Sequence, residues 1–146
     1  MIRIDALKNY CNGLGVLISA DRVLYVVRED HLQRKLGGAA GLFLCVVLPS
    51  AQTTGGADAV VDVNTVLLYV LRNHVKADAT DESELGDYAA MQELASSIRQ
   101  RIITDADAQT TPMTFLDRRS VAIDPEWNVA GGYNGYSITF EFIDHE

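Results

Sequence analysis

Three histidines, His31, His74 and His145, are the side chains of this sequence best suited to metal binding or proton transfer. A zinc site needs His, Cys or carboxylate ligands that converge, and its ligands commonly recur at short spacings along the chain. None of the three histidines has a second His, Cys or carboxylate three or four residues away in a convincing ligand pattern. We therefore expect no metal site and no cofactor.

The two cysteines, Cys11 and Cys45, lie in apolar stretches and form no CxxC or Cys/His motif. Thiols in such surroundings are typical of reduced core residues, and a disulfide or half of a metal site is the less favoured interpretation. The cysteines therefore predict a cytoplasmic protein.

The motifs of nucleophilic and phosphate chemistry are weak as well. No serine lies in a G-x-S-x-G elbow. The stretch NGLGVLIS resembles the start of a glycine-rich nucleotide loop, but it follows a predicted helix instead of a strand and lacks the third glycine. Carboxylates are plentiful in predicted loops, where they are usually solvated. We expect a protein that is not an enzyme.

The charge of the chain argues against nucleic-acid binding. Its 12 Lys and Arg residues against 20 Asp and Glu residues give a net charge of −8, which repels phosphates. The one basic cluster, Arg118 and Arg119, has the chemistry to hold a phosphate. Two arginines that follow Asp117 at the entrance of a strand are nevertheless more typical of a solvated sheet edge.

The length and the apolar runs predict one soluble domain over residues 1–146. The longest apolar runs, GLFLCVVLP and NTVLLYVL, are shorter than the roughly 20 residues that cross a bilayer. The N-terminal segment has no apolar core before a small-residue cleavage site, so we expect no signal peptide and no membrane partner.

The first half of the chain predicts a helix, two long strands and two shorter elements. Apolar residues recur at three or four positions over 4–14, which predicts a helix stopped by Asn12 and Gly13 or Gly15. Residues 22–28 read as a strand, and a helical turn closed by Gly37 follows. The apolar run LFLCVVLPSA predicts a central strand that ends at Pro49. Residues 59–72 predict either a long strand or a strand with a bulge near 62–64.

A long helix follows the stretch ADATDES. Asp81 or Ser83 is expected to cap it, and Asp81, Glu82 and Glu84 place negative charge at its positive end. Arg99 and Arg101 are expected in its last turns. The residues predicted to share its sheet-facing side are Leu85, Tyr88, Met91, Ala95, Ile98 and Ile102.

The C-terminal third alternates apolar and polar residues over two segments, 121–129 and 136–142, which predicts two one-sided antiparallel strands. Together the elements predict an α+β fold, a mostly antiparallel β-sheet with an N-terminal helix and one long helix packed on its apolar face. Pro125 has no N–H to donate, so its strand is expected at a sheet edge.

Two turn signals compete in the last hairpin. A turn at Asn134-Gly135 would leave Val121 and Ile123 without opposite residues, whereas a turn at Gly131-Gly132 pairs the whole of 121–129. We expect the Gly131-Gly132 turn, with Asn134-Gly135 as a bulge or a widened tip. The expected register then pairs Tyr136 with Trp127, Phe140 with Ile123 and Phe142 with Val121.

The aromatic residues near this turn are candidates for an interface. Aromatic side chains are enriched in protein interfaces, and a glycine-rich tip cannot bury all of Trp127, Tyr133 and Tyr136. We expect Trp127 to pack with Tyr136 at the end of the core beneath the long helix. For Tyr133 the core and a partner are equally favoured. Arg118 and Arg119 complete the candidate interface residues.

The order of elements resembles that of the small tail terminator, or tail-completion, proteins of long-tailed bacteriophages and prophages. The resemblance covers nearly the whole chain in element order and length, from the N-terminal helix through GLFLCVVLPSA, AVVDVNTVLLYVLRN and ELGDYAAMQELASSIRQRII to the closing hairpin GYSITFEF. It implies an α+β subunit that forms a ring, expected to be hexameric, on the end of a tail tube and contacts the head-side connector. No motif fixes a position, so no functional residue is carried over.

Three hypotheses about function follow. The first is a non-enzymatic assembly subunit of a phage or prophage tail, which would lie in the bacterial cytoplasm and then in the virion tail. The second is a small cytosolic protein-binding or adaptor module that acts as a homo-oligomer through a sheet edge. The third, less favoured, is an enzyme that uses scattered carboxylates in a concave pocket.

Overall fold

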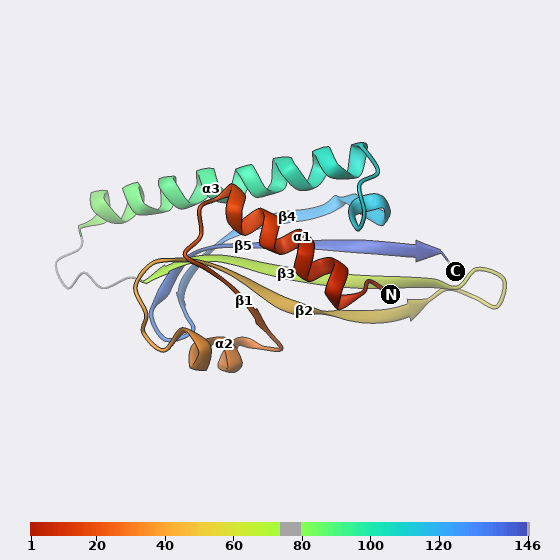
Figure 1. The fold of residues 1–146 in the computed structure, drawn as a ribbon, viewed down its shortest axis with the longest axis horizontal. Helices are drawn as coiled ribbons and strands as arrows, with labels where there is room; N and C mark the ends of the chain where they lie inside the picture. The colour runs from red at the N-terminus through yellow and green to blue at the C-terminus, as the bar shows by residue number, and fades with distance from the viewer. Residues whose placement is uncertain (74–79, 146) are drawn as a thin grey trace.

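A computed structural model describes residues 1–73 and 80–145. Within them the chain forms three α-helices, one 3-10 helix and a five-stranded sheet (Figure 1). The predicted α+β fold is confirmed. The elements in chain order are α1 (Ile4–Leu17), β1 (Arg22–Val26), α2 (Glu29–Leu36), β2 (Leu42–Thr54), β3 (Val61–Asn73), α3 (Asp81–Asp107), η1 (Met113–Phe115), β4 (Leu116–Val129) and β5 (Tyr133–His145).

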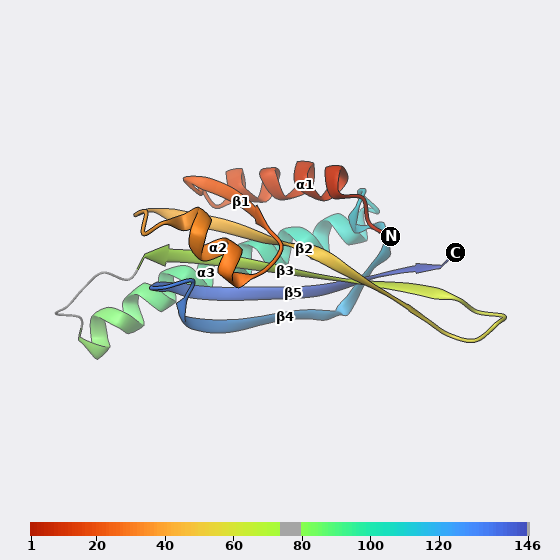
Figure 2. The same cartoon turned by 90° about the horizontal axis from the view of Figure 1, so that it is seen from below.

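The sheet has the strand order β1-β2-β3-β5-β4, and every pair of neighbouring strands except β1 and β2 is antiparallel. Helices α1 and α3 cover one face of the sheet and form the larger core with it. Helix α2 covers one end of the opposite face (Figure 2). The sequence predicted one wet face, but this second core also includes Phe43, Leu71 and Tyr133.

Helix α1 begins where it was predicted and runs three residues beyond the predicted end at residue 14. Its buried side carries Leu7, Cys11 and Leu14, in agreement with the predicted spacing. The glycines do not stop it. Gly15 faces β1, where a Cβ would lie 2.3 Å from Val23 Cγ2, so the glycine permits close packing of helix on strand. Helix α2 ends at Gly37, whose φ of 56° is the predicted left-handed cap.

Strands β2 and β3 form one long hairpin, in which β3 is the long strand that the sequence offered as one alternative, whereas the predicted end of β2 is wrong. Strand β2 is an interior strand as expected, but it does not end at Pro49 and continues to Thr54. The bulge lies in β2, where two residues, Leu48 and Pro49, oppose Val66 alone, and β3 pairs regularly through 62–64. A proline has no backbone N–H to donate to the hydrogen-bond ladder of a sheet. Pro49 lies in the bulge, where the ladder is interrupted and no such donor is needed.

Helix α3 is the longest element, and Thr80 caps it instead of Asp81 or Ser83. The Thr80 hydroxyl accepts from Ser83 N at 3.2 Å, and Thr80 N donates to Ser83 Oγ at 3.0 Å, which makes a capping box. The predicted sheet-facing side is confirmed for Met91, Ala95, Ile98 and Ile102.

Two further predictions about α3 are wrong. Leu85 is 70 % exposed, because the first turns of the helix extend past the covered part of the sheet. The helix also runs to Asp107, so Arg99 and Arg101 precede a last turn that has no basic residue. None of the described helices combines the length and the apolar character needed to cross a membrane.

Candidate interaction surfaces

The β4–β5 hairpin turns at Ala130–Gly132, as the Gly131-Gly132 signal predicted. Gly132 N donates to Val129 O at 3.3 Å, and Gly131 and Gly132 have φ angles of 82° and 128°, which favour glycine. Asn134 and Gly135 lie inside β5. A Cβ on Gly135 would lie 1.9 Å from the Val70 carbonyl oxygen, so this glycine serves close strand packing and not a turn.

The register of the hairpin differs from the predicted one. Strand β5 places Ile138 opposite Ile123, Tyr136 opposite Pro125 and Phe142 opposite Leu116. Two irregularities in β4 cause the shift, one between Asp117 and Ala122 and one between Glu126 and Val129. The predicted edge position of the Pro125 strand is confirmed, because β4 pairs with β5 alone.

Trp127 is exposed, contrary to the prediction that it packs beneath the long helix. It lies in the irregularity between Glu126 and Val129, where Asn128 adopts a φ of 56° and donates its N–H to Asn134 Oδ1 at 2.8 Å. An extra residue reverses the alternation of side chains along a strand. Val129 accordingly packs in the core beside α2, and Trp127, within the irregularity, is 69 % exposed on an edge strand.

Tyr133 is buried beside the turn, so its side chain is not available to a partner, whereas Gly131 in the turn is exposed. The tyrosine is 1 % exposed, donates its hydroxyl to Ala39 O at 2.8 Å and packs edge-on against Phe43. Burial raises the pKa of Tyr133. Helix α2 also contacts the turn, since Ala130 N donates to Glu29 Oε1 at 3.2 Å.

Tyr136 lies half-buried on the α3 side and helps to form a surface groove that the sequence did not indicate. Its ring packs edge-on against Tyr88, whose hydroxyl donates to Glu126 O at 2.7 Å and ties α3 to β4. The groove between the start of α3 and β4 is lined by Asp81, Glu84, Leu85, Tyr88, Pro125 and Tyr136. The spacing of apolar residues predicted Leu85 in the core, so nothing in the sequence indicated that Leu85 lines this groove.

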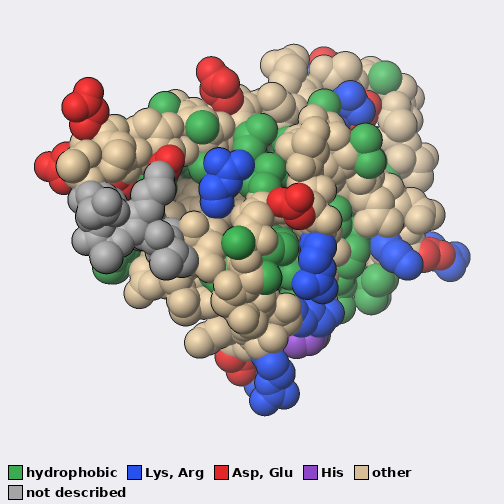
Figure 3. Space-filling model, turned by 60° about the vertical axis from the view of Figure 1, so that its left-hand side comes forward, with side chains coloured by type: hydrophobic (Ala, Val, Ile, Leu, Met, Phe, Trp, Pro, Cys, Tyr) green, Lys and Arg blue, Asp and Glu red, His purple; other side chains and the backbone are tan. Residues whose placement is uncertain are grey.

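Arg118 and Arg119 lie at the far end of β4 from Trp127, within the first irregularity of the strand. Their side chains are 57 % and 96 % exposed. Arg118 pairs with Asp107 at the end of α3, and Arg119 lies 4.0 Å from Asp117. This arrangement is that of a solvated sheet edge. On the face seen in Figure 3, basic side chains are interspersed with acidic ones and do not form one patch.

Besides the outer side of β1, the described part of the sheet has two open edge segments of different character, one on β4 and one on β2. Strand β4 has no strand on its outer side among the described residues. Strand β1 pairs with β2 only from Phe43 to Val47, so Ser50–Thr54 pair with β3 alone. Backbone groups on such edges are free to pair with another chain.

No protein-family model matches the chain, and neither does any curated protein.

In the described part of the chain, the His, Cys, Asp and Glu side chains do not gather into a metal site. Within residues 1–73 and 80–145, no three His, Cys, Asp or Glu side chains are grouped so that they could hold a metal ion. His31 Nδ1 accepts from Val27 N at 3.2 Å, whereas His74 and the side chain of His145 lie outside the described part. Cys11 and Cys45 are free and buried, which confirms them as core thiols.

Proposed function

We propose that the protein is a non-enzymatic assembly subunit of a phage or prophage tail. It resembles a tail terminator, in which copies of one chain form a ring that contacts the tail tube and the head-side connector. The observation that carries the proposal is the pair of unlike open edges on one sheet. The α+β architecture that the resemblance implies is also the architecture of this chain.

Unlike edges suit a ring because a ring needs heterologous contacts. When the β4 edge of one copy meets the β2 edge of the next, every copy uses both surfaces once and the contact repeats until the circle closes. Strand addition of this kind takes its affinity from main-chain hydrogen bonds. Trp127 supplies an exposed aromatic anchor on β4, a residue type enriched where interfaces are energetically strongest.

The hairpin formed by β2 and β3 gives the subunit a second contact element. Figure 1 shows its loop extending beyond both chain termini and beyond the helices that cover the body of the sheet. Residues 50–60 at this end are exposed. A projecting hairpin is suited to reach a neighbouring protein such as a tail-tube subunit, while the net charge of −8 disfavours retention of passing DNA.

Two edge variants and their mixture test the proposed contact. Trp127→Lys places a charge on the β4 edge and Ala51→Lys places one on the open part of β2. Val16→Lys is the control, because Val16 is 81 % exposed on α1 and belongs to neither β4 nor β2. Sedimentation velocity and negative-stain microscopy of the wild type and of Val16→Lys are expected to show rings, and each edge variant alone is expected to be monomeric.

The mixture separates a ring from a symmetric dimer. In a head-to-tail contact, the Trp127→Lys variant keeps an intact β2 edge and the Ala51→Lys variant keeps an intact β4 edge. These two edges pair, so the mixture forms a heterodimer, and assembly does not continue because the remaining edges both carry a lysine. A homodimer through β4, as in the adaptor hypothesis, leaves Ala51→Lys dimeric and gives no heterodimer. A wild-type chain that is monomeric with and without tail-tube protein, or whose gene lies in a metabolic operon, contradicts the proposed function.

A further inference from the structure

A pocket of about 210 Å³ lies between the N-terminal segment and the 3-10 helix η1. Exposed residues surround its mouth, among them Arg3, Thr114 and Phe115, whereas Asn64 and Phe142 at its floor are buried. Ile2, Ala6 and Pro112 line its walls. The pocket is therefore mostly apolar, with one buried polar side chain at the bottom.

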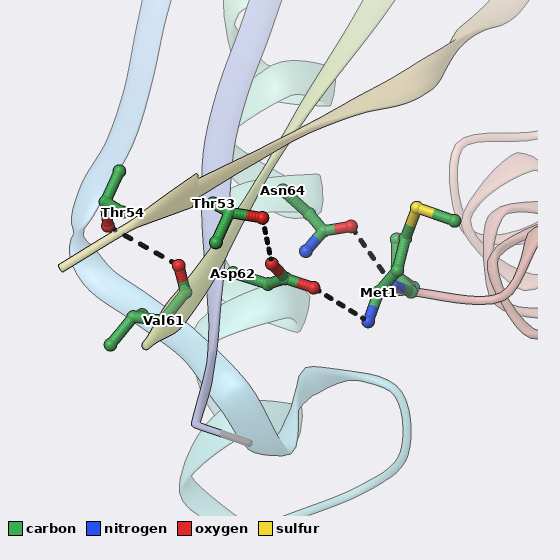
Figure 4. Close-up of polar contacts among 7 residues, drawn as sticks. Met1, Thr53, Thr54, Val61, Asp62 and Asn64 are labelled. Carbon is green, nitrogen blue, oxygen red and sulfur yellow. Dashed lines mark hydrogen bonds and ion pairs between the residues drawn. The ribbon is translucent and has the colours of Figure 1, made fainter. Parts of the chain in front are cut away.

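Asn64 has a hydrogen-bond donor that the described chain does not satisfy. Its side chain is 0 % exposed, and its Oδ1 accepts from Ile2 N at 3.1 Å. This bond fixes the orientation of the amide, since a reversed amide would set Nδ2 against another N–H. Figure 4 shows the amide oxygen directed at the N-terminal segment and the nitrogen turned away from it. Nδ2 has no partner among the described residues, and a buried donor without an acceptor destabilises the fold.

The charged groups near the pocket are paired with one another. The Met1 ammonium lies 3.8 Å from Asp62 Oδ2, and Asp62 Oδ1 accepts from Thr53 Oγ1 at 2.9 Å (Figure 4). Arg3 pairs with Asp5 at 3.0 Å. Each cation at the mouth thus has a carboxylate beside it, and Asn64 Nδ2 is the buried side-chain donor without a partner among the described residues that line the pocket.

We propose that this pocket binds a neutral carbonyl group attached to a small apolar body, with the carbonyl oxygen accepting from Asn64 Nδ2. A 150 Å³ cavity holds benzene, so a pocket of this size takes roughly six to nine non-hydrogen atoms. A branched aliphatic amide fits, and so does the backbone carbonyl of a partner peptide with its apolar side chain. The proposal goes beyond the assembly function and does not rest on it.

Three probes test the chemistry. Isovaleramide and isovalerate share an apolar body and differ in charge, and N-acetyl-leucinamide carries the same body in peptide form. Binding is followed by the side-chain amide resonance of Asn64 in ¹H–¹⁵N spectra, assigned by its absence in Asn64→Leu, and by the rise of Tm with probe concentration. Isovaleramide is expected to shift this resonance saturably and to bind at least tenfold more tightly than isovalerate. A tighter fit of N-acetyl-leucinamide identifies a peptide as the source, and a weaker one identifies a free small molecule.

Three variants decide whether the pocket itself binds. Asn64→Leu removes the donor with little change of shape and is expected to weaken isovaleramide binding at least tenfold without lowering Tm. Ala6→Leu fills the pocket and leaves Asn64 intact, so it keeps the proposal testable if Asn64→Leu does not fold, and it is expected to abolish binding. Ser137→Ala is the matched control, since Ser137 is a buried polar residue on the opposite face of the sheet. Equal binding by all variants, a tighter fit of isovalerate, or only a water molecule at Nδ2 overturns the proposal.

Discussion

The two buried thiols couple the stability of the protein to alkaline pH. Cys11 lies in the core under α1 and Cys45 lies in the core beside α2. Burial raises the pKa of each thiol from 9.0 to about 12, because an apolar interior disfavours the thiolate. Both thiols therefore stay protonated in the folded state at pH values where the unfolded chain ionises.

The free energy of unfolding is predicted to fall between pH 9 and about pH 12. Each folded pKa lies above its unfolded value, so the stabilisation is complete below pH 9 and is lost as the pH rises through that window. At pH 10 the loss is about 1.4 kcal/mol per thiol, or roughly 3 kcal/mol for both. Urea unfolding at pH 8 and pH 10 measures it. A Cys11→Ala/Cys45→Ala variant provides the control, and an equal pH dependence in that variant contradicts the assignment.

At the residue scale, the sequence predicted core residues correctly where apolar residues recur at the regular spacing of a helix or strand. The prediction failed where a bulge interrupts that spacing. Cys11 and Cys45 lie in apolar surroundings, and their burial was predictable. Trp127 was expected in the core and is exposed at the irregularity between Glu126 and Val129, where Asn128 is left-handed, and Tyr133, for which core and partner were equally favoured, is buried. Asparagine adopts the left-handed region more readily than most residues, but a single asparagine in a sequence does not show that a strand is interrupted there.

At the scale of elements, the contact between β3 and β5 depends on the absence of a side chain at Gly135. The residue lies opposite Leu71 in the ladder, and a Cβ there would lie 1.9 Å from Val70 O and 3.1 Å from Met91 Cε. A strand glycine normally weakens a sheet. Here it lets β5 and α3 pack closely on β3.

Gly135→Ala is predicted to destabilise the protein by about 1–3 kcal/mol, the usual cost of overpacking a core. Urea denaturation measures the change. Gly86→Ala in α3 is the matched control, because no atom lies within 4 Å of a Cβ there, and it is predicted to stabilise by about 0.5–1 kcal/mol. If both glycines tolerate alanine equally, the close packing at Gly135 is not required.

The same glycine shows why element order was more predictable than register. Asn134-Gly135 is the stronger local turn signal, but the contact with Val70 that holds it in a strand joins residues far apart in sequence. Pro49 likewise predicted the end of a strand, but it lies in a bulge and β2 continues beyond it. Long runs of regularly spaced apolar residues predicted that β2, β3 and α3 exist. Bulges then changed the pairing and the ends of the strands.

At the scale of the whole molecule, the candidate interface moved from the hairpin tip to the sheet edge. The contact of the turn with α2 could not be predicted from sequence, because Glu29, which accepts from Ala130 N, lies about 100 residues earlier in the chain. What remains exposed is the β4 edge, with Trp127 near one end and Arg118 and Arg119 near the other. The open part of β2 is its proposed complement.

Association of the proposed ring is predicted to strengthen with salt. Each copy carries a net charge of −8, so copies repel at low ionic strength, and a main-chain contact between sheet edges supplies no compensating charge. Sedimentation at 50 mM and 500 mM NaCl measures the effect. Replacing Arg118 and Arg119 with glutamine removes two positive charges and changes −8 to −10, which is predicted to weaken association at 50 mM NaCl and to leave it unchanged at 500 mM. Weakening of the wild-type assembly by salt would indicate instead that these arginines form ion pairs across the interface.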